Sequence, residues 1–157
     1  MLRLSKLTDY AVVVLARLSA EDEVQTSPSV ASSTGIPEPT VAKVLKTLAA
    51  AGLVTSFRGA RGGYRLSRPL SAMPVADVIT AIDGPIALTA CVDGATGGCE
   101  CQELCCMRGR WNGVNEAIRR ALGAITLADM QKDGRLMPPP LHGAAGATPQ
   151  IHVPAAE

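Results

Sequence analysis

Residues 27–67 combine two short helix patterns with a glycine-rich hairpin, and this combination restricts the fold more than any other feature. Ser27-Pro28 has the form of a helix cap followed by proline, and Gly35 is placed to end that helix after about two turns. After a turn at 35–37, apolar residues recur at i, i+3, i+4 and i+7, namely Val41, Val44, Leu45 and Leu48. We therefore predict a helix-turn-helix whose second helix ends near Gly52.

Two strand-like segments, Leu53 to Arg58 and Tyr64 to Ser67, follow this pair of helices. The glycines between them permit positive φ and close approach to another backbone, so we interpret the hairpin as a wing. Arginines at its tip suit a narrow minor groove, and the exposed face of the second helix suits the major groove. The residues predicted to contact DNA are Thr40, Lys43, Lys46, Thr47, Arg58, Gly59, Arg61, Gly62, Gly63 and Tyr64.

The formal net charge of +1 conceals two blocks of opposite sign. Residues 39–68 carry six basic side chains and no acid, whereas residues 69–107 carry five acids and no lysine or arginine. A run of like charge is usually a solvated face, so the basic block gains weight only through its position on a helix-turn-helix. Aromatic residues make up 3% of the chain, which argues against a protein that stacks single-stranded bases.

Apolar periodicity predicts helices on both sides of this region. One runs from Tyr10 to about Ser19 and another from Ser71 to Asp83, and the caps available to the first are Ser5, Thr8 and Asp9. A long helix is predicted beyond, because apolar residues step by threes and fours: Leu104, Met107, Trp111, Val114, Ile118, Ala121 and Ile125. We expect this stripe to join two subunits, the alternative being that it packs on its own domain.

These elements predict a mainly α (α+β) chain, a winged helix-turn-helix with a long C-terminal dimerisation helix. We divide it into a DNA-binding domain (1–84), a cysteine-rich cluster-binding loop (85–106) and a dimerisation helix region (107–132). Thr126 to Gln131 adds a further turn of helix. Residues 133–157 are rich in Pro, Gly and Ala and are predicted to form a disordered tail.

All five cysteines lie between Cys91 and Cys106, and an odd number cannot pair completely within one chain. The only histidines, His142 and His152, lie in the tail, so we predict no catalytic dyad, no enzymatic activity and no small-molecule substrate. The apolar run from Tyr10 to Ala16 is too short to span a bilayer. We therefore expect a cytoplasmic protein with no membrane partner.

The sequence resembles the Rrf-two family of bacterial winged-helix regulators, especially its iron–sulfur members, which control cluster assembly operons of the Isc and Suf systems. The resemblance covers roughly residues 1–131. It rests on Leu4-Ser5-Lys6-Leu7-Thr8-Asp9-Tyr10-Ala11, Gly52-Leu53-Val54, Arg58-Gly59-Ala60-Arg61-Gly62-Gly63-Tyr64, Cys91-x7-Cys99-x5-Cys105, Trp111 and Ile125-Thr126-Leu127. The Suf operon regulators are the branch that this chain is most similar to.

The resemblance implies an iron–sulfur cluster, [4Fe-4S] or [2Fe-2S], held by Cys91, Cys99 and Cys105. Cys101 and Cys106 depart from the family's three cysteines, and their roles are spare thiols, alternative ligands or oxidation-prone partners. Arg108 stands where one branch of the family has a ligating histidine, and Asp9 stands where another has an aspartate ligand from the partner subunit. A helix cap is the alternative role of Asp9. Zinc and a thiol–disulfide switch remain the alternative uses of the cysteines.

By this resemblance, the chain is expected to be a homodimeric repressor of iron–sulfur assembly genes that binds an inverted-repeat site in double-stranded DNA. Ala42 occupies the position of the glutamate that discriminates DNA targets in the family, so its target sequence is expected to differ. The competing hypothesis is a zinc-binding or thiol-redox protein without a cluster, whose winged helix docks on another protein.

Overall fold

The structure is a computed structural model that describes residues 4–95 and 105–132. Its elements in chain order are α1 (Lys6–Leu18), α2 (Ser27–Thr34), α3 (Glu38–Ala50), β1 (Val54–Phe57), β2 (Gly63–Leu66), the 3-10 helix η1 (Leu70–Ala72), α4 (Val75–Asp83), α5 (Asn112–Ala124) and α6 (Leu127–Gln131). Cys99, Cys101 and the predicted tail lie outside the described residues. The predicted α+β winged helix-turn-helix is confirmed; the predicted long C-terminal helix is not found in the described residues.

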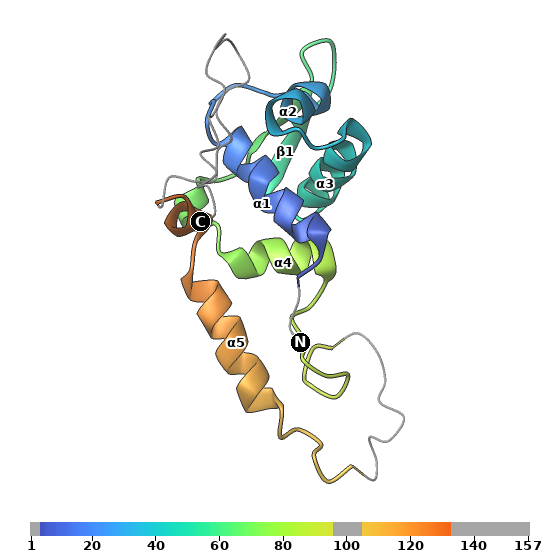
Figure 1. Ribbon diagram of the computed structural model, residues 1–157, viewed down its shortest axis with the longest axis vertical. Coiled ribbons are helices and arrows are strands. Elements are labelled where there is room, and N and C mark those ends of the chain that lie inside the picture. The colour runs from blue at the N-terminus through green and yellow to red at the C-terminus, as the bar shows by residue number, and fades with distance from the viewer. Residues whose placement is uncertain (1–3, 96–104, 133–157) are drawn as a thin grey trace, which may run out of the picture.

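The helix-turn-helix consists of α2 and α3, which pack on α1 (Figure 1). The Thr26 side chain caps α2, and Gly35, with φ of 72°, ends it in the left-handed conformation that glycine adopts without steric cost. The four periodic apolar residues of α3 are fully buried, as predicted: Val41, Val44, Leu45 and Leu48. Their burial against α1 fixes the opposite face of α3 toward solvent.

Helix α1 begins at Lys6, four residues before Tyr10, because Ser5, one of the three predicted caps, is its cap. The Ser5 hydroxyl accepts a hydrogen bond of 3.2 Å from the backbone N–H of Thr8. Asp9 lies exposed in the first turn, where a carboxylate favours the positive end of the helix dipole, and it is not the cap.

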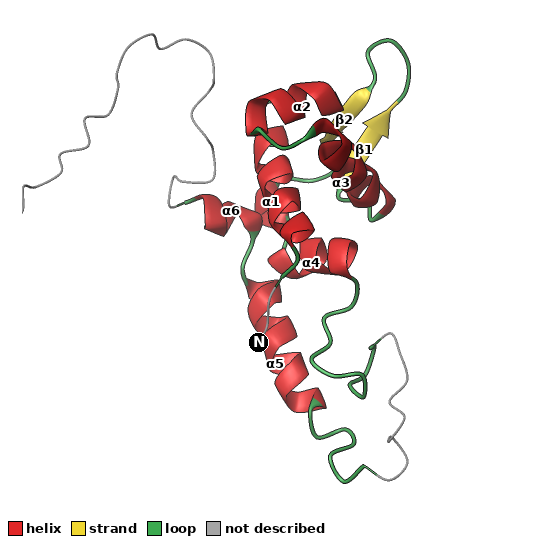
Figure 2. Ribbon diagram, turned by 45° about the vertical axis from the view of Figure 1, so that its right-hand side comes forward, coloured by secondary structure: helices red, strands yellow, loops and turns green. Residues whose placement is uncertain are grey.

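The hairpin pairs Val54 with Leu66 and Phe57 with Gly63 in an antiparallel register and projects from the body beside α3 (Figure 2). Gln25 extends the pairing on the other side of β2, since its backbone exchanges hydrogen bonds of 2.9 and 2.8 Å with Tyr64. The predicted wing is therefore present and is anchored to the segment between α1 and α2.

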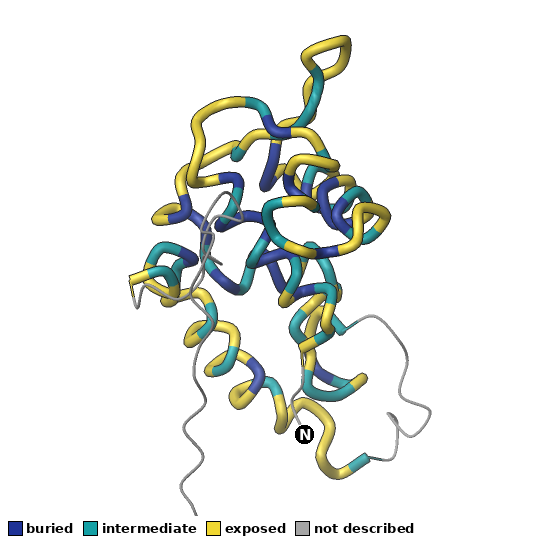
Figure 3. The backbone as a smooth tube through the Cα atoms, turned by 45° about the horizontal axis from the view of Figure 1, so that its top comes forward, coloured by how far each residue is buried: buried dark blue, intermediate teal, exposed yellow. Residues whose placement is uncertain are grey.

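Helix α6 returns to the body of the molecule after α5. Leu127 is almost fully buried, and its backbone N–H donates to the carbonyl of Met73 at 3.0 Å. The backbone N–H of Val75 donates to the carbonyl of Ile125 at 2.9 Å. A reciprocal capping box between Thr126 and Asp129 starts this helix. Buried residues concentrate in the body, whereas the wing tip and most of α5 are exposed (Figure 3).

Two further helix boundaries differ from the sequence prediction, and each has a local cause. Helix α4 begins at Val75 rather than Ser71, because Pro74 disfavours helical conformation at Met73, which is extended. Helix α5 begins at Asn112 rather than near Leu104, because Gly109 adopts a φ of 72°, which interrupts a right-handed helix. The C-terminal helix therefore has 13 residues.

Candidate nucleic-acid interface and cysteine loop

The outer face of α3 carries the residues predicted to enter the major groove. Lys43 and Lys46 are exposed, and Thr40 and Thr47 are half-buried. The Thr47 hydroxyl donates to the carbonyl of Lys43 at 3.0 Å, so its hydrogen is used within the helix. The two lysines are therefore the charged groups that this face presents to solvent.

The basic side chains of the hairpin divide into engaged and unengaged groups. Arg68 forms an ion pair of 2.5 Å with Asp77 on α4, and Arg65 lies 5.5 Å from the centre of the Phe57 ring. Arg58 and Arg61 are exposed at the hairpin tip, and within the described part of the chain neither contacts a carboxylate. Among the described residues, four cations of the basic block, two on α3 and two on the wing, therefore have no carboxylate partner.

The predicted wing glycines have distinct structural roles. Gly59 has a φ of 103°, a conformation that other residues rarely adopt. A Cβ on Gly62 would lie 2.6 Å from the Phe57 carbonyl oxygen, and one on Gly63 would lie 2.5 Å from that of Gln25. Tyr64 is half-buried against the core. These positions therefore shape the hairpin, whatever they contact outside the chain.

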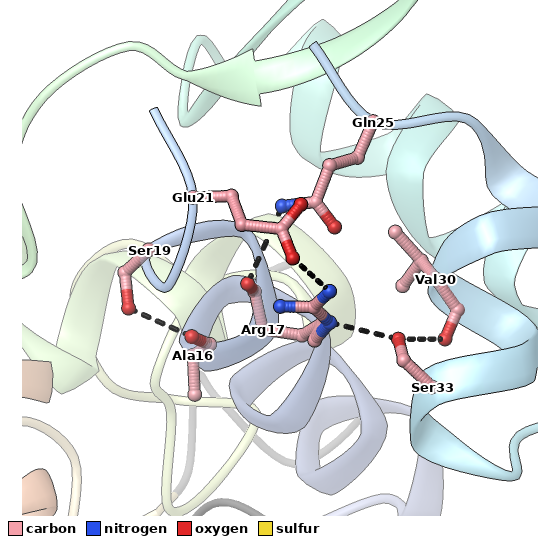
Figure 4. Close-up of polar contacts among 7 residues, drawn as sticks. All are labelled: Ala16, Arg17, Ser19, Glu21, Gln25, Val30 and Ser33. Carbon is pink, nitrogen blue, oxygen red and sulfur yellow. Dashed lines mark hydrogen bonds and ion pairs between the residues drawn. The ribbon is translucent and has the colours of Figure 1, made fainter. Parts of the chain in front are cut away.

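A polar network that sequence reasoning missed joins α1 to α2 and to Gln25, the residue whose backbone pairs with β2 (Figure 4). Arg17 Nε donates to Ser33 Oγ on α2 at 2.9 Å, and the same guanidinium pairs with Glu21. Gln25 Nε2 donates to the carbonyl of Arg17 at 3.5 Å, while Gln25 Oε1 is buried without a partner among the described atoms. The only sequence signal for this network is an arginine near the end of an otherwise apolar helix.

The end of α4 is tied to the start of α1 by Asp83. Its carboxylate accepts hydrogen bonds from the Ser5 backbone N–H at 3.2 Å and from the Thr8 hydroxyl at 2.8 Å. Partial desolvation raises the pKa of Asp83, but these hydrogen bonds outweigh it and bring the pKa below the ordinary value of 3.8. The cysteine loop thus leaves the body from a fixed point.

The described cysteines lie on the two sides of residues 96–104. Cys91 and Cys105 are half-buried, Cys106 is exposed, and Cys91 Sγ shares a hydrogen bond of 3.2 Å with the Thr89 hydroxyl. In the sequence, Cys91 and Cys105 flank Cys99 and Cys101. Thiolates are the soft donors that an iron–sulfur cluster takes, so the residues fit that group. Within the described ranges, no three metal-ligating side chains come together, and Asp9 does not join Cys91 and Cys105.

The fold and the basic face define a winged helix-turn-helix protein of the DNA-binding class. Residues 4–133 match the family Rrf2, described as iron-dependent transcriptional regulator. The chain therefore belongs to the Rrf2 family of transcriptional regulators, and the predicted resemblance is confirmed. Members of this family are regulators rather than enzymes, which agrees with the predicted lack of enzymatic activity. Within the described residues, no helix has the length and hydropathy needed to cross a bilayer.

Relatives and solved structures extend this finding. Protein aau3 of Rhizobium meliloti is 35% identical over 125 residues, which cover 79% of this chain and 77% of the relative. The solved structure of CymR, the global cysteine regulator of B. subtilis, aligns with a TM-score of 0.61 and 26% identity, covering 83% of this chain and 96% of CymR. IscR of T. potens aligns with a TM-score of 0.59 and 28% identity, covering 92% and 94%.

Proposed function

We propose that this regulator is a homodimeric repressor of iron–sulfur cluster assembly genes, of the Suf or Isc type, whose DNA affinity follows the state of a cysteine-bound cluster. The observation that carries DNA recognition is the set of four exposed cations on α3 and the wing tip that pair with no carboxylate in the part of the chain that the structure describes. Similarity to IscR of T. potens supports the choice of an iron–sulfur cluster.

In this proposal, α3 enters the major groove and the wing tip enters the adjacent minor groove. Lys43, Lys46, Arg58 and Arg61 neutralise phosphates or enter the grooves, and the other proposed contacts are Thr40, Thr47, Gly59, Gly62, Gly63 and Tyr64. A symmetric dimer presents two such surfaces, which match an inverted repeat. If about half of the twelve basic side chains of residues 39–68 in a dimer contact phosphates, affinity falls on the order of 10³-fold between 50 and 200 mM salt.

The dimer interface is assigned to the outward side of α5. Trp111, Val114 and Ile125 are 39%, 47% and 47% exposed, although they belong to one apolar stripe. Leu122 of the same helix packs on the chain's own core. Leu122 lies outside the stripe, so α5 packs on its own core through another position and leaves the exposed stripe for a second copy.

Cys91, Cys99 and Cys105 would hold the cluster, with Asp9 of the partner subunit as the proposed fourth ligand and with Cys101 and Cys106 as spare thiols. A bound cluster, [4Fe-4S] or [2Fe-2S], supplies a group whose loss or oxidation reports iron and redox conditions. The chain's own part is to present thiolates from a loop that runs directly into α5.

The proposal is tested by anaerobic purification, followed by absorption spectra and iron and sulfide analysis, on the wild type and on Asp9→Ala. A brown protein with matching iron and sulfide supports the cluster. The same samples are then titrated with duplexes selected from a random-sequence pool. Arg58→Ala should weaken binding by about 1–3 kcal/mol through loss of a groove contact, whereas Arg119→Ala on α5 serves as the charge-matched control and should bind as the wild type does.

A thiol-redox or zinc-loaded regulator is the second candidate. It is favoured by the exposed Cys106 next to the half-buried Cys105 and by similarity to CymR, a cysteine regulator. A colourless protein that contains zinc, or whose thiols pair on oxidation, would support this candidate and contradict the cluster. Salt-insensitive binding to duplexes would contradict DNA recognition in both candidates.

A further inference from the structure

Two asparagines one turn apart on α5 hold the backbone of the segment that contains Cys91. Asn115 is 3% exposed; its Oδ1 accepts from the backbone N–H of Leu88 at 3.0 Å, and its Nδ2 donates to the carbonyl of Ile86 at 3.0 Å. Asn112 Oδ1 accepts from the backbone N–H of Asp93 at 3.2 Å, and its Nδ2 donates to the Asp93 carboxylate at 2.5 Å. The segment is thus fixed to α5 on both sides of Cys91.

The contacts of Asn115 resemble those of a paired strand, because one amide group satisfies both a backbone donor and a backbone acceptor. Removing a buried partner leaves those backbone groups unsatisfied, which is more costly than losing an exposed hydrogen bond. Val92, next to Cys91, is 5% exposed and adds apolar burial to the same segment. Among the described residues, α5 therefore holds the backbone on both sides of Cys91.

Cys105 and Cys106 are held differently. The backbone hydrogen bonds of this segment with other described residues are local, such as Arg108 N–H to the Cys105 carbonyl at 3.1 Å. Cys91 of the proposed ligand set thus belongs to a segment that is hydrogen-bonded to α5, whereas Cys105 belongs to a turn that leads into the same helix. A ligand that draws these two thiols together therefore applies a force to the first turn of α5.

We propose that Asn115 is a positioning residue that couples Cys91 to α5, so that a change at the cysteine loop alters the DNA affinity of α3. The path is a set of direct contacts: the segment 86–93 bonds to α5, α5 packs on α4, and α4 packs on α3. This inference rests on the proposed sensing function and names the side chain through which sensing reaches the reading helix.

The first test uses the full-length apo protein and needs no cluster. Asn115→Leu keeps the side-chain volume close to that of asparagine but removes both hydrogen bonds. Alkylation of Cys91 by iodoacetamide, followed by peptide mass spectrometry, should become about tenfold faster, the change expected for losing about one net hydrogen bond of local stability. Cys106 alkylation is the internal control and should not change. An unchanged Cys91 rate would overturn the proposal.

The second test measures DNA affinity with and without reconstituted cluster. The ratio of the two affinities should move toward one in Asn115→Leu, while the apo protein keeps its DNA affinity; Arg58→Ala should lower both affinities and leave the ratio unchanged. A wild-type ratio of one would contradict the proposed function. A wild-type ratio different from one that persists in Asn115→Leu would contradict the role of Asn115. If Asn115→Leu does not fold by circular dichroism, Asn115→Ser, which is too short to reach both Ile86 and Leu88, carries the same comparison.

Discussion

Gly63 allows the wing to lie against the segment between α1 and α2, and replacing it with alanine tests this contact. An added Cβ would lie 2.5 Å from the Gln25 carbonyl oxygen and 2.8 Å from Val24 Cγ1, closer than real Cβ contacts. Its φ is not in the left-handed region, so the effect of Gly63→Ala is steric alone. Relief requires Gln25 to move away, which weakens its two backbone hydrogen bonds to Tyr64.

The magnitude follows from these contacts. Overpacking against a fixed backbone costs about 1–3 kcal/mol, and each of the two weakened hydrogen bonds adds at most about 1 kcal/mol, so the free energy of unfolding should fall by about 1–5 kcal/mol. Urea denaturation followed by circular dichroism measures this fall. Gly113→Ala on α5 is the matched control, because nothing lies within 4 Å of its added Cβ. That helical substitution should be neutral or stabilising by roughly 0.5–1 kcal/mol. Equal stability of Gly63→Ala and wild type would refute the steric reasoning.

Two further predictions concern α5 and α4. Val114→Lys should shift the protein toward monomer in sedimentation velocity, because it places a charge in the exposed apolar stripe of α5. The control, Glu116→Lys, changes an exposed position outside that stripe and should leave the dimer intact. An unchanged dimer in Val114→Lys would contradict α5 as the interface. Asp83→Asn should lower the urea midpoint at neutral pH. Because the folded pKa of Asp83 is lowered, its carboxylate stabilises the fold above 3.8, and this contribution is lost as pH falls through the folded pKa. The variant should therefore lose less stability in acid than the wild type, and parallel pH curves would contradict the assignment.

Local patterns predicted the helix-turn-helix well because α2 and α3 are specified by contacts within a few residues. The spacing of Val41, Val44, Leu45 and Leu48 identified the buried face of α3, and all four are fully buried. The boundary errors arose where a single residue overrides periodicity: Pro74 delays α4, and Gly109 delays α5. The spacing of apolar residues shows which face of a helix would be buried. It does not reveal a break in the backbone that leaves this spacing unchanged.

The missed features of the candidate sites are side chains that bond to distant backbone or side-chain atoms. Asn115 bonds to Leu88 and Ile86, which precede it by 27 and 29 positions, and Arg17 bonds to Ser33 on the next helix. No local spacing encodes such pairs, because their geometry exists only after the helices have packed. The burial of Asn115, which requires partners for its amide, is known only from the packed structure.

The return of α6 to the body has a consequence for how the chain folds and moves. Because Ile125 and Leu127 bond to residues 73–75, the chain between α4 and α6 is attached to the same core at both of its ends. A segment attached at both ends can tilt or slide, but it cannot swing away as a terminal arm can. The body also cannot complete its core until the chain beyond α5 has been synthesised, which raises the contact order and places residues 86–93 in the same folding unit as the helix-turn-helix.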